Sequence, residues 1–185
     1  MTEGSPAAAS SVPATDRCSS CGAAAPGGRS GCQDLWDEFQ QRSLTDLRYA
    51  AVHDLAFDTY CMQHVETYCR SAKSYAAHLM RLCCGLEHSG SRSVYAAIQA
   101  WLSQNPILEK PQPLLKVGRM TIADVSGASS GEERSRLTRA WANSVWMAYA
   151  PQHHVARAWI EAALGDGERR RARRKRSRDA DGTSW

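Results

Sequence analysis

The sequence predicts an all-α protein folded as a single bundle of four to five helices. Apolar residues recur at helical spacing along most of the chain, and short connections join the stretches that carry this pattern. The chain has 185 residues, of which 43% are hydrophobic, which suits one core of ordinary size. We therefore expect one helical domain, with a zinc-knuckle-like loop at its start and a long, kinked helix near its end.

The first half of the chain predicts four helices. The first spans about 33–43 and the second about 46–68, each with apolar side chains on one face. Ser71 is typical of a helix N-cap, so a third helix runs from there to about His88, and Gly90-Ser91 begins a fourth. The stripes consist of Leu35, Trp36 and Phe39; Val52, Leu55, Ala56 and Thr59; Tyr75, Leu79, Leu82 and Cys83; and Val94, Ile98, Trp101 and Leu102.

Prolines shape the segment that follows the fourth helix. Asn105-Pro106 ends that helix, and residues 114–122 predict either a short hairpin or a covering loop. The pattern Thr121-x2-Asp124 resembles a capping box on one short helical turn.

A long helical pattern covers about 131–164. Pro151 must kink or divide it, because proline lacks an N–H group and crowds the preceding turn. We expect Gly165-Asp-Gly167 to end the helix.

The two ends of the chain differ from the domain between them. Residues 1–16 contain little to bury, so we expect a disordered tail, followed by a helical domain over 17–166. Residues 167–185 predict a disordered basic tail, because like charges repel one another. The formal net charge of the chain is +4, but residues 168–185 alone sum to +5, so the rest of the protein is nearly neutral.

Cysteine usage and hydropathy indicate the compartment. The chain has seven cysteines, an odd number, and Cys83 and Cys84 are adjacent within a predicted helix, so a disulfide framework is not expected. The start of the chain lacks the pattern of a secretory signal, and no apolar run approaches the roughly 20 residues of a membrane span. We expect a cytoplasmic protein without membrane contact.

Three cysteines at the start of the domain predict a metal site within the loop 17–32. Cys18 and Cys21 form a C-x2-C pair, and Cys32 follows at the start of a helix, where a thiolate is stabilised. His53 is the histidine nearest in sequence, and we expect it to complete a Cys3His site for one zinc ion. Such a site would be structural, whereas a water in the fourth position would make the zinc a Lewis acid.

The remaining histidines raise the alternative of a second polar site inside the bundle. His64 and His78 flank the turn between the second and third helices, so we expect them at the same height on antiparallel helices. Asp58 is placed to orient a neighbouring group. The candidate residues of this site are His64, His78, His153, His154 and Asp58.

Several short motifs together resemble a family of small bacterial proteins of unknown function, over roughly 17–160. The family has no assigned activity, so the resemblance implies a residue pattern and no mechanism. The motifs are Cys18-x2-Cys21-Gly22, Cys32-Gln-Asp-Leu, Val52-His53-x-Leu55-x2-Asp58-x-Tyr60-x2-Gln63-His64, His78-Leu79-x2-Leu82-Cys83, Leu86-Glu-His88, Thr121-Ile-Ala-Asp-Val125, Trp141-Ala-x-Ser-Val-Trp146 and His153-His154.

These observations leave three classes of function open. The first is a zinc-stabilised helical protein that acts by binding or regulation, and the second is an enzyme with a site inside the bundle. The chain has no glycine-rich phosphate loop, Gly-x-Ser-x-Gly elbow or His-Glu-x2-His helix. The third is non-specific association with nucleic acid through the basic tail. Its contacts would be Arg169, Arg170, Arg171, Arg173, Arg174, Lys175, Arg176 and Arg178.

Overall fold

A computed structural model describes residues 16–115 and 117–181 of the chain, and over these residues the fold is all-α. The described residues form nine α-helices and a short 3-10 turn, without a β-strand, so the helices outnumber the four to five that we expected. They are α1 (Arg29–Thr45), α2 (Leu47–Ala50), α3 (His53–Gln63), α4 (Val65–Tyr68), α5 (Ala72–Glu87), α6 (Arg92–Leu102), α7 (Ile122–Ser126), α8 (Gly131–Ala148), η2 (Ala150–Gln152) and α9 (His153–Asp181).

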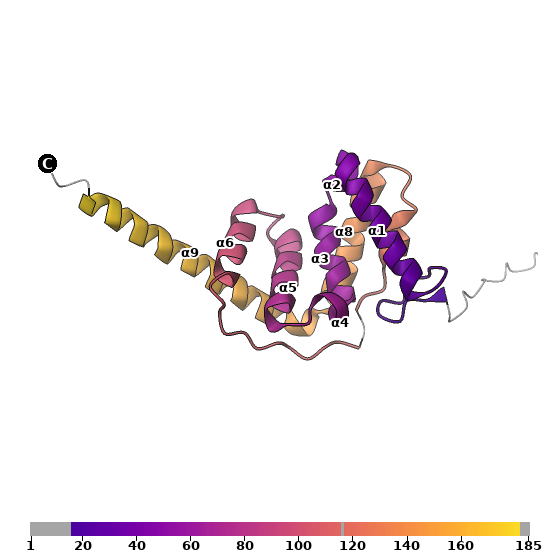
Figure 1. Ribbon diagram of the computed structural model, residues 1–185, viewed down its shortest axis with the longest axis horizontal. Coiled ribbons are helices and arrows are strands. Elements are labelled where there is room, and N and C mark those ends of the chain that lie inside the picture. The colour runs from indigo at the N-terminus through magenta and orange to yellow at the C-terminus, as the bar shows by residue number, and fades with distance from the viewer. Residues whose placement is uncertain (1–15, 116, 182–185) are drawn as a thin grey trace, which may run out of the picture.

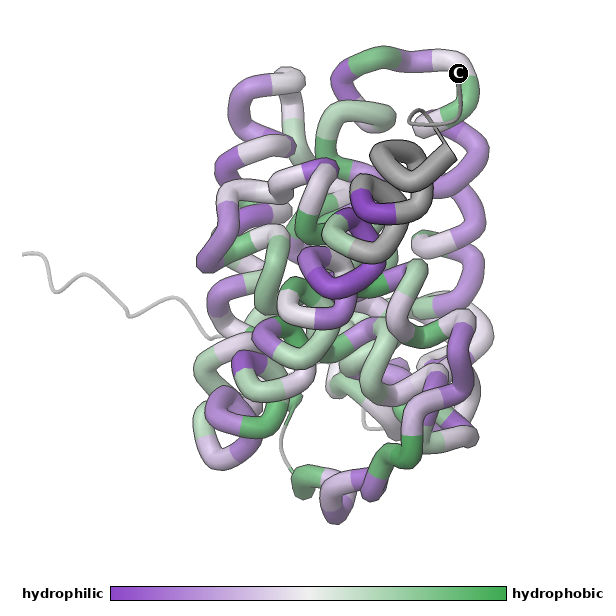
Figure 2. Tube along the Cα trace, turned by 90° about the vertical axis from the view of Figure 1, so that its left-hand side faces the viewer, coloured by the Kyte–Doolittle hydropathy of each residue, from purple (hydrophilic) through white to green (hydrophobic). Residues whose placement is uncertain are grey.

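The bundle is organised around α5, which packs against α3, α6, α8 and α9 (Figure 1). On the other side of α3 and α8, helices α1, α2 and α7 form a second group. Figure 2 shows hydrophobic and hydrophilic residues interspersed along the helices of the bundle, as expected for helices that bury one face. The core holds five fully buried large aromatic side chains: Trp36, Tyr60, Tyr75, Trp141 and Tyr149.

The extra helices come mainly from the segment 46–68, where we expected one helix. The structure divides this segment into α2, α3 and α4, with non-helical backbone at Val52 and at His64. The predicted stripe is correct in its spacing, but the chain turns twice within it. The break at His64 matters for the site described below.

Helix starts agree with the local signals in the sequence. The Ser71 hydroxyl accepts a hydrogen bond from the Ser74 amide (3.0 Å), and the Ser71 amide donates to the Ser74 hydroxyl (3.1 Å), which makes a capping box for α5. The Thr121 amide donates to the Asp124 carboxylate (2.7 Å) at the start of α7. Both predicted N-termini are confirmed.

The segment between α6 and α7 is a covering loop, and its described residues include no strand of a hairpin. Side chains of the bundle hold its backbone. The Gln63 amide donates to the carbonyls of Val117 and Met120 (both 2.9 Å), while the Ser144 hydroxyl accepts from the amides of Arg119 and Met120. The loop thereby closes one side of the core.

Pro151 divides the long helical pattern, as predicted: α8 ends at Ala148, a 3-10 turn follows, and α9 begins at His153. The expected end at Gly165 is wrong, because α9 continues as a helix through Gly165 and Gly167 to Asp181. Each glycine costs a helix only about 1 kcal/mol, and the arginine-rich sequence beyond them is a good helix former. The helical backbone over 167–181 therefore replaces the disordered tail that we expected, and most of the predicted N-terminal tail lies outside the described residues.

None of the helices in the described parts of the chain combines the length and apolar character that crossing a membrane requires.

Candidate metal centre

The cysteine-rich loop is folded around a tight turn that carries the first two thiols. The Gly22 amide donates to the Cys18 carbonyl (2.8 Å), and the Cys18 amide donates to the Ala23 carbonyl (2.9 Å). Gly22 has a φ of +78°, a conformation that glycine adopts readily and other residues rarely do. The turn therefore presents Cys18 and Cys21 to one common point.

The third thiol comes from the start of α1. Cys32 lies in the first turn of this helix, and its amide donates to the Gly28 carbonyl (2.9 Å). The loop folds tightly onto the helix beside it: a Cβ atom at Gly31 would lie 2.0 Å from the carbonyl oxygen of Pro26. A side chain at position 31 would consequently push the loop away from Cys32.

The fourth side chain at this point is His64, at the break between α3 and α4. Its Nδ1 lies 2.8 Å from the carbonyl oxygen of Tyr60. Because a carbonyl only accepts, Nδ1 carries the hydrogen, and Nε2 offers its lone pair in the opposite direction. Nε2 lies 3.6 Å from both the Cys18 and the Cys32 Sγ atoms. This is the tautomer and orientation of a metal-ligating histidine.

Three of the six distances among the four ligand atoms match the edges of a tetrahedron around one zinc ion. Zinc bonds of about 2.3 Å to sulfur and about 2.0–2.1 Å to nitrogen imply edges of about 3.8 Å between sulfurs and about 3.6 Å between sulfur and nitrogen. The Cys21 and Cys32 sulfurs are 3.7 Å apart, and both sulfur-to-His64 distances are 3.6 Å. All four ligand atoms lie within 4.8 Å of one another.

The site is closed to solvent. The exposed fractions of Cys18, Cys21, Cys32 and His64 are 2%, 8%, 0% and 3%. A hydrogen bond from the Cys21 thiol lowers the pKa of Cys32 to about 4, against the effect of burial, with further help from His64 and Tyr60. The same hydrogen bond, together with burial, raises the pKa of Cys21. The geometry thus favours a thiolate at Cys32 in the absence of any ion.

Neighbouring side chains fix the loop against the bundle. Arg29 on α1 donates to the Ser20 hydroxyl (2.8 Å) and to the Glu66 carboxylate (2.9 Å), and Glu66 belongs to α4. On the inner side, the Tyr60 ring stacks on His64 at a centroid distance of 4.0 Å, and its hydroxyl lies 3.8 Å from the Cys32 sulfur. The loop is therefore held both at the surface and in the core.

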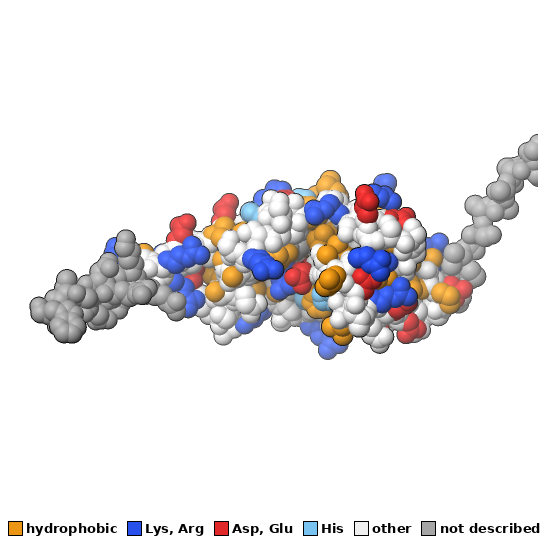
Figure 3. Space-filling model, turned by 90° about the horizontal axis from the view of Figure 1, so that it is seen from above, with side chains coloured by type: hydrophobic (Ala, Val, Ile, Leu, Met, Phe, Trp, Pro, Cys, Tyr) orange, Lys and Arg blue, Asp and Glu red, His pale blue; other side chains and the backbone are white. Residues whose placement is uncertain are grey.

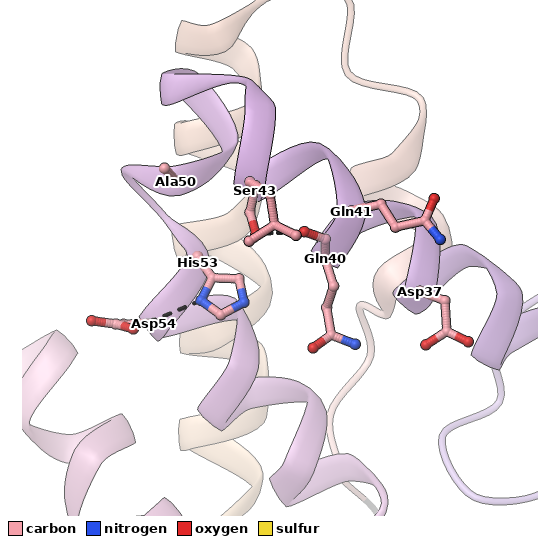
Figure 4. A pocket seen from close by; sticks show the side chains of 8 residues that line it. Asp37, Gln40, Gln41, Ser43, Ala50, His53 and Asp54 are labelled. Carbon is pink, nitrogen blue, oxygen red and sulfur yellow. Dashed lines mark hydrogen bonds and ion pairs between the residues drawn. The ribbon is translucent and has the colours of Figure 1, made fainter.

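The expectation that His53 completes the site is corrected, because the structure places His64 with the three cysteines. His53 lies eleven residues earlier, at the start of α3, which is about 16 Å along a helix. Its ring stacks on Trp36 at 6.4 Å, and its Nδ1 is 3.8 Å from the Asp54 carboxylate. Figure 4 shows it lining an open groove beside α1, together with Asp37, Gln40, Gln41 and Ser43.

The proposed second polar site is not assembled in the described structure. His78 lies at the level of Asp58, about 9 Å before His64 along α3, because its Nδ1 is 2.9 Å from the Asp58 carboxylate. His153 stacks on Trp146 and bonds its carbonyl oxygen (2.8 Å), whereas His154 is exposed. Each of these histidines thus has its own surroundings, and His64 belongs to the thiols.

Asp58 does orient a neighbouring group, as the sequence suggested. Its carboxylate is fully buried, with one oxygen on His78 and the other 3.1 Å from the Nε of Arg81. Burial raises the pKa of Asp58, although both partners oppose this shift. We call Asp58, His78 and Arg81 the ion cluster; Arg81 is a member that the sequence did not reveal.

Arg29 and Glu66, which hold the cysteine-rich loop at the surface, are further residues that the sequence did not reveal. The side-chain partners that hold them around the loop are 9 to 46 residues away in the chain, so no local spacing points to them. The basic residues near the C-terminus lie on α9, where the described side chains of Arg169, Arg170, Arg171 and Arg176 are exposed.

The comparisons with known proteins identify the family of the chain. The model of a family of unknown function, DUF5946, matches residues 16–150, and the protein belongs to this family. The match includes all four side chains of the metal centre and ends before α9. The comparisons with curated proteins and with solved structures found no match.

Proposed function

We propose that Cys18, Cys21, Cys32 and His64 bind one structural zinc ion, and that the domain acts in the cytoplasm as a binding or regulatory module. Three thiolates and one imidazole are a donor set typical of zinc. The observation that carries the proposal is the convergence of four buried ligand atoms within 4.8 Å of one another, with three of their distances equal to the edges of a zinc tetrahedron.

The enclosure of the site supports a structural role for the ion. All four ligands come from the protein and each is at least nine-tenths buried. They fill the four positions of a tetrahedral site, so none is left for a water molecule. A catalytic zinc keeps an open position for water or substrate. The ion would instead join the loop 17–32 to α1 and to the break after α3, and its binding free energy would become stability of this end of the bundle.

The alternative of an enzyme inside the bundle has weaker support. Its candidate histidines are bonded to separate partners, at Tyr60, Asp58 and Trp146. A module that presents its surface to a partner requires only that the bundle be rigid, and a zinc-clamped loop contributes to that.

Elemental analysis tests the proposal on protein purified without added metal. We expect one equivalent of zinc for the wild type, and a loss of that zinc in Cys32→Ser and His64→Ala. His53→Ala is the matched control, because it removes the histidine that the sequence favours and leaves the cluster intact. Wild-type protein without zinc, or zinc lost in His53→Ala and retained in His64→Ala, would overturn the assignment.

The loss of zinc must be separated from simple unfolding. Circular dichroism and the oligomeric state of each variant are therefore measured alongside, and cobalt is used as a spectroscopic probe. Cobalt bound to the wild type should show the intense absorption of a tetrahedral thiolate site, with a weaker thiolate band in Cys32→Ser. A wild-type spectrum of octahedral cobalt would exclude the Cys3His site.

A further inference from the structure

The C-terminal half of α9 extends beyond the bundle. Ala163 is the last residue of this helix whose side chain is described as buried, and Gln104 donates to the Asp166 carboxylate (2.7 Å) close to the point where the helix leaves α6. From there the helical backbone continues to Asp181 and projects away from the other helices (Figure 1). The metal centre lies toward the opposite end of the molecule.

The sequence of this projecting segment places basic residues at backbone positions around most of its circumference. Eight of the ten residues from Arg169 to Arg178 are Arg or Lys. Successive residues of a helix advance by about 100°, so these eight backbone positions leave no uncharged face wider than about 100°. A helix that binds at a membrane surface needs a broad apolar face, and the only apolar residue within the segment is Ala172.

The charge density of the segment resembles that of duplex DNA. Ten helical residues rise about 15 Å, so the eight charges are spaced on average about 1.9 Å apart along the axis. Duplex DNA carries one negative charge per about 1.7 Å of its axis, and its major groove is wide enough to admit an α-helix. A helix that is charged on all sides can face the phosphates of both strands at once.

The rest of the protein does not share this charge. Outside residues 168–185 the formal charge sums to −1. Figure 3 shows basic and acidic side chains interspersed over one face of the bundle. The basic charge is thus confined to the projecting part of α9 and does not continue a basic surface of the bundle.

We infer that Arg169–Arg178 form a helical arm that binds duplex nucleic acid through its phosphates, without reading the base sequence. This inference is independent of the zinc site. Binding draws its free energy from the release of counterions, so it falls steeply as salt rises. Contacts to phosphates alone carry no sequence information.

The test uses the full-length, zinc-loaded protein and two unrelated fluorescent 20-base-pair DNA duplexes. Fluorescence anisotropy is measured between 25 and 200 mM NaCl. We expect equal affinity for the two sequences, with a slope of log affinity against log salt of about −4.5 to −7, as five to eight phosphate contacts predict at about −0.9 each. No binding at 25 mM NaCl, or a marked preference for one sequence, would refute the inference.

A pair of variants with equal charge locates the contact. In the arm variant, Arg169, Arg170, Arg171 and Arg176 become Gln; in the bundle variant, the exposed Arg92, Arg119, Arg136 and Arg139 become Gln. The slope of log affinity against log salt should become less negative by up to about 3.6 in the arm variant, as four lost charges at about 0.9 each predict. This variant should also bind at least tenfold more weakly at 100 mM NaCl. The slope of log affinity against log salt in the bundle variant should differ from the wild-type slope by less than about 1. Equal losses in both variants would show a general charge effect and reject the arm as the contact.

Two further measurements address the helix and the partner. Ala172→Pro breaks the helix without changing its charge, because proline costs a helix interior about 3 kcal/mol. Several-fold weaker binding by this variant supports a helical arm, and unchanged binding rejects it.

Vesicles of 30% phosphatidylserine in phosphatidylcholine provide the second comparison. Binding to them as strong as binding to the duplex at the same salt would reject nucleic acid as the specific partner.

Discussion

The metal centre and the ion cluster both bring a histidine into the interior beside α3, but their polar atoms are arranged in opposite ways. In the ion cluster, hydrogen donors of His78 and Arg81 meet the two oxygens of Asp58, at 2.9 and 3.1 Å. In the metal centre, three sulfurs and His64 Nε2, all of them atoms that can ligate a metal, converge on one another. The first arrangement is complete within the protein, whereas the second is one that could hold a cation.

This difference shows how to distinguish a binding site from an internal ion pair. Both clusters contain a buried acidic group whose pKa is shifted, Cys32 in the metal centre and Asp58 in the ion cluster. Burial and pKa shifts therefore do not separate them. The distinction lies in whether the converging atoms form complete donor–acceptor pairs or are all atoms that can ligate a metal ion.

Removal of the metal should produce the largest effect. A strong chelator at neutral pH should lower the free energy of unfolding of the wild type. It should also speed cleavage by trypsin after Arg17 and Arg29, whose side chains are already exposed, because the loop that carries them loosens. The loss should remain below the roughly 10–16 kcal/mol that zinc supplies to isolated zinc-finger peptides, because the bundle keeps its own core. His78→Asn, which alters the ion cluster alone, should respond to the chelator like the wild type. A chelator without effect on either protein would contradict the comparison.

Asp58→Ala should produce the next largest effect. It removes the carboxylate and leaves the Arg81 guanidinium and the His78 imidazole without their partner, which costs about 3–5 kcal/mol when such a pair is buried. The Arg81 side chain is 32% exposed, so the lower end of this range is expected. Urea denaturation measures the loss, and the zinc content should stay at one equivalent.

Asp54→Ala is the matched control for Asp58→Ala. The Asp54 carboxylate also approaches Arg81, at 4.0 Å, but it is 73% exposed, so its removal should cost less than about 0.5 kcal/mol. Equal losses in the two variants, or a loss of zinc in Asp58→Ala, would show that the clusters are not independent.

The sequence could predict those parts of the fold and site that depend on neighbouring residues. The C-x2-C pair and Cys32 are linked by local spacing, the caps at Ser71 and Thr121 act over three residues, and the effect of Pro151 is confined to its own turn. Each of these features is present in the structure because its cause is local.

The choice between His53 and His64 depends on contacts between distant parts of the chain. Both histidines belong to one stripe with Phe57 and Tyr60, so helical periodicity cannot separate them. His64 reaches Cys18 across 46 residues and Cys32 across 32 residues, and that approach is set by how the loop packs on the bundle. A break in the helix at His64, which has no strong sequence signal, completes the orientation.

Arg29→Ala tests whether the loop depends on its surface contacts as well as on the metal. It removes the bonds from α1 to Ser20 and Glu66 and leaves all four ligands in place. Removing a direct hydrogen-bond partner of a ligand lowers metal affinity about 10–100-fold, and Arg29 acts one step further away, so we expect a several-fold loss. Competition with a zinc indicator measures it. Arg42→Ala, also on α1 but bonded to Glu38 and Tyr49, should leave the affinity unchanged; a loss there too would point to a general effect of α1.

The last expected effect is a small one and concerns the surface ion pair between Glu87 and Arg157, which gives a scale for the buried cluster. The Glu87 carboxylate accepts hydrogen bonds from Arg157 on α9 (2.7 and 2.8 Å), and this lowers its pKa from 4.5 to about 2, with help from Trp146. Above about pH 5, Glu87 is ionised in both the folded and the unfolded chain, so its contribution to stability is fully present. As the pH falls from about 4.5 toward 2, the unfolded chain takes up the proton first, and the contribution is lost.

Glu87→Gln should therefore cost less than about 1 kcal/mol at pH 7, because the Arg157 side chain is 51% exposed, and the difference from the wild type should shrink at pH 3. Urea denaturation of both proteins at pH 3, 5 and 7 measures this, and because zinc is released by acid in both, its loss cancels in the difference. Arg157→Gln should show the same pH dependence, and the double variant should add nothing to it. A difference that stays constant from pH 7 to pH 3 would mean that Glu87 stabilises the protein through packing, and a surface pair could then no longer serve as the scale for Asp58.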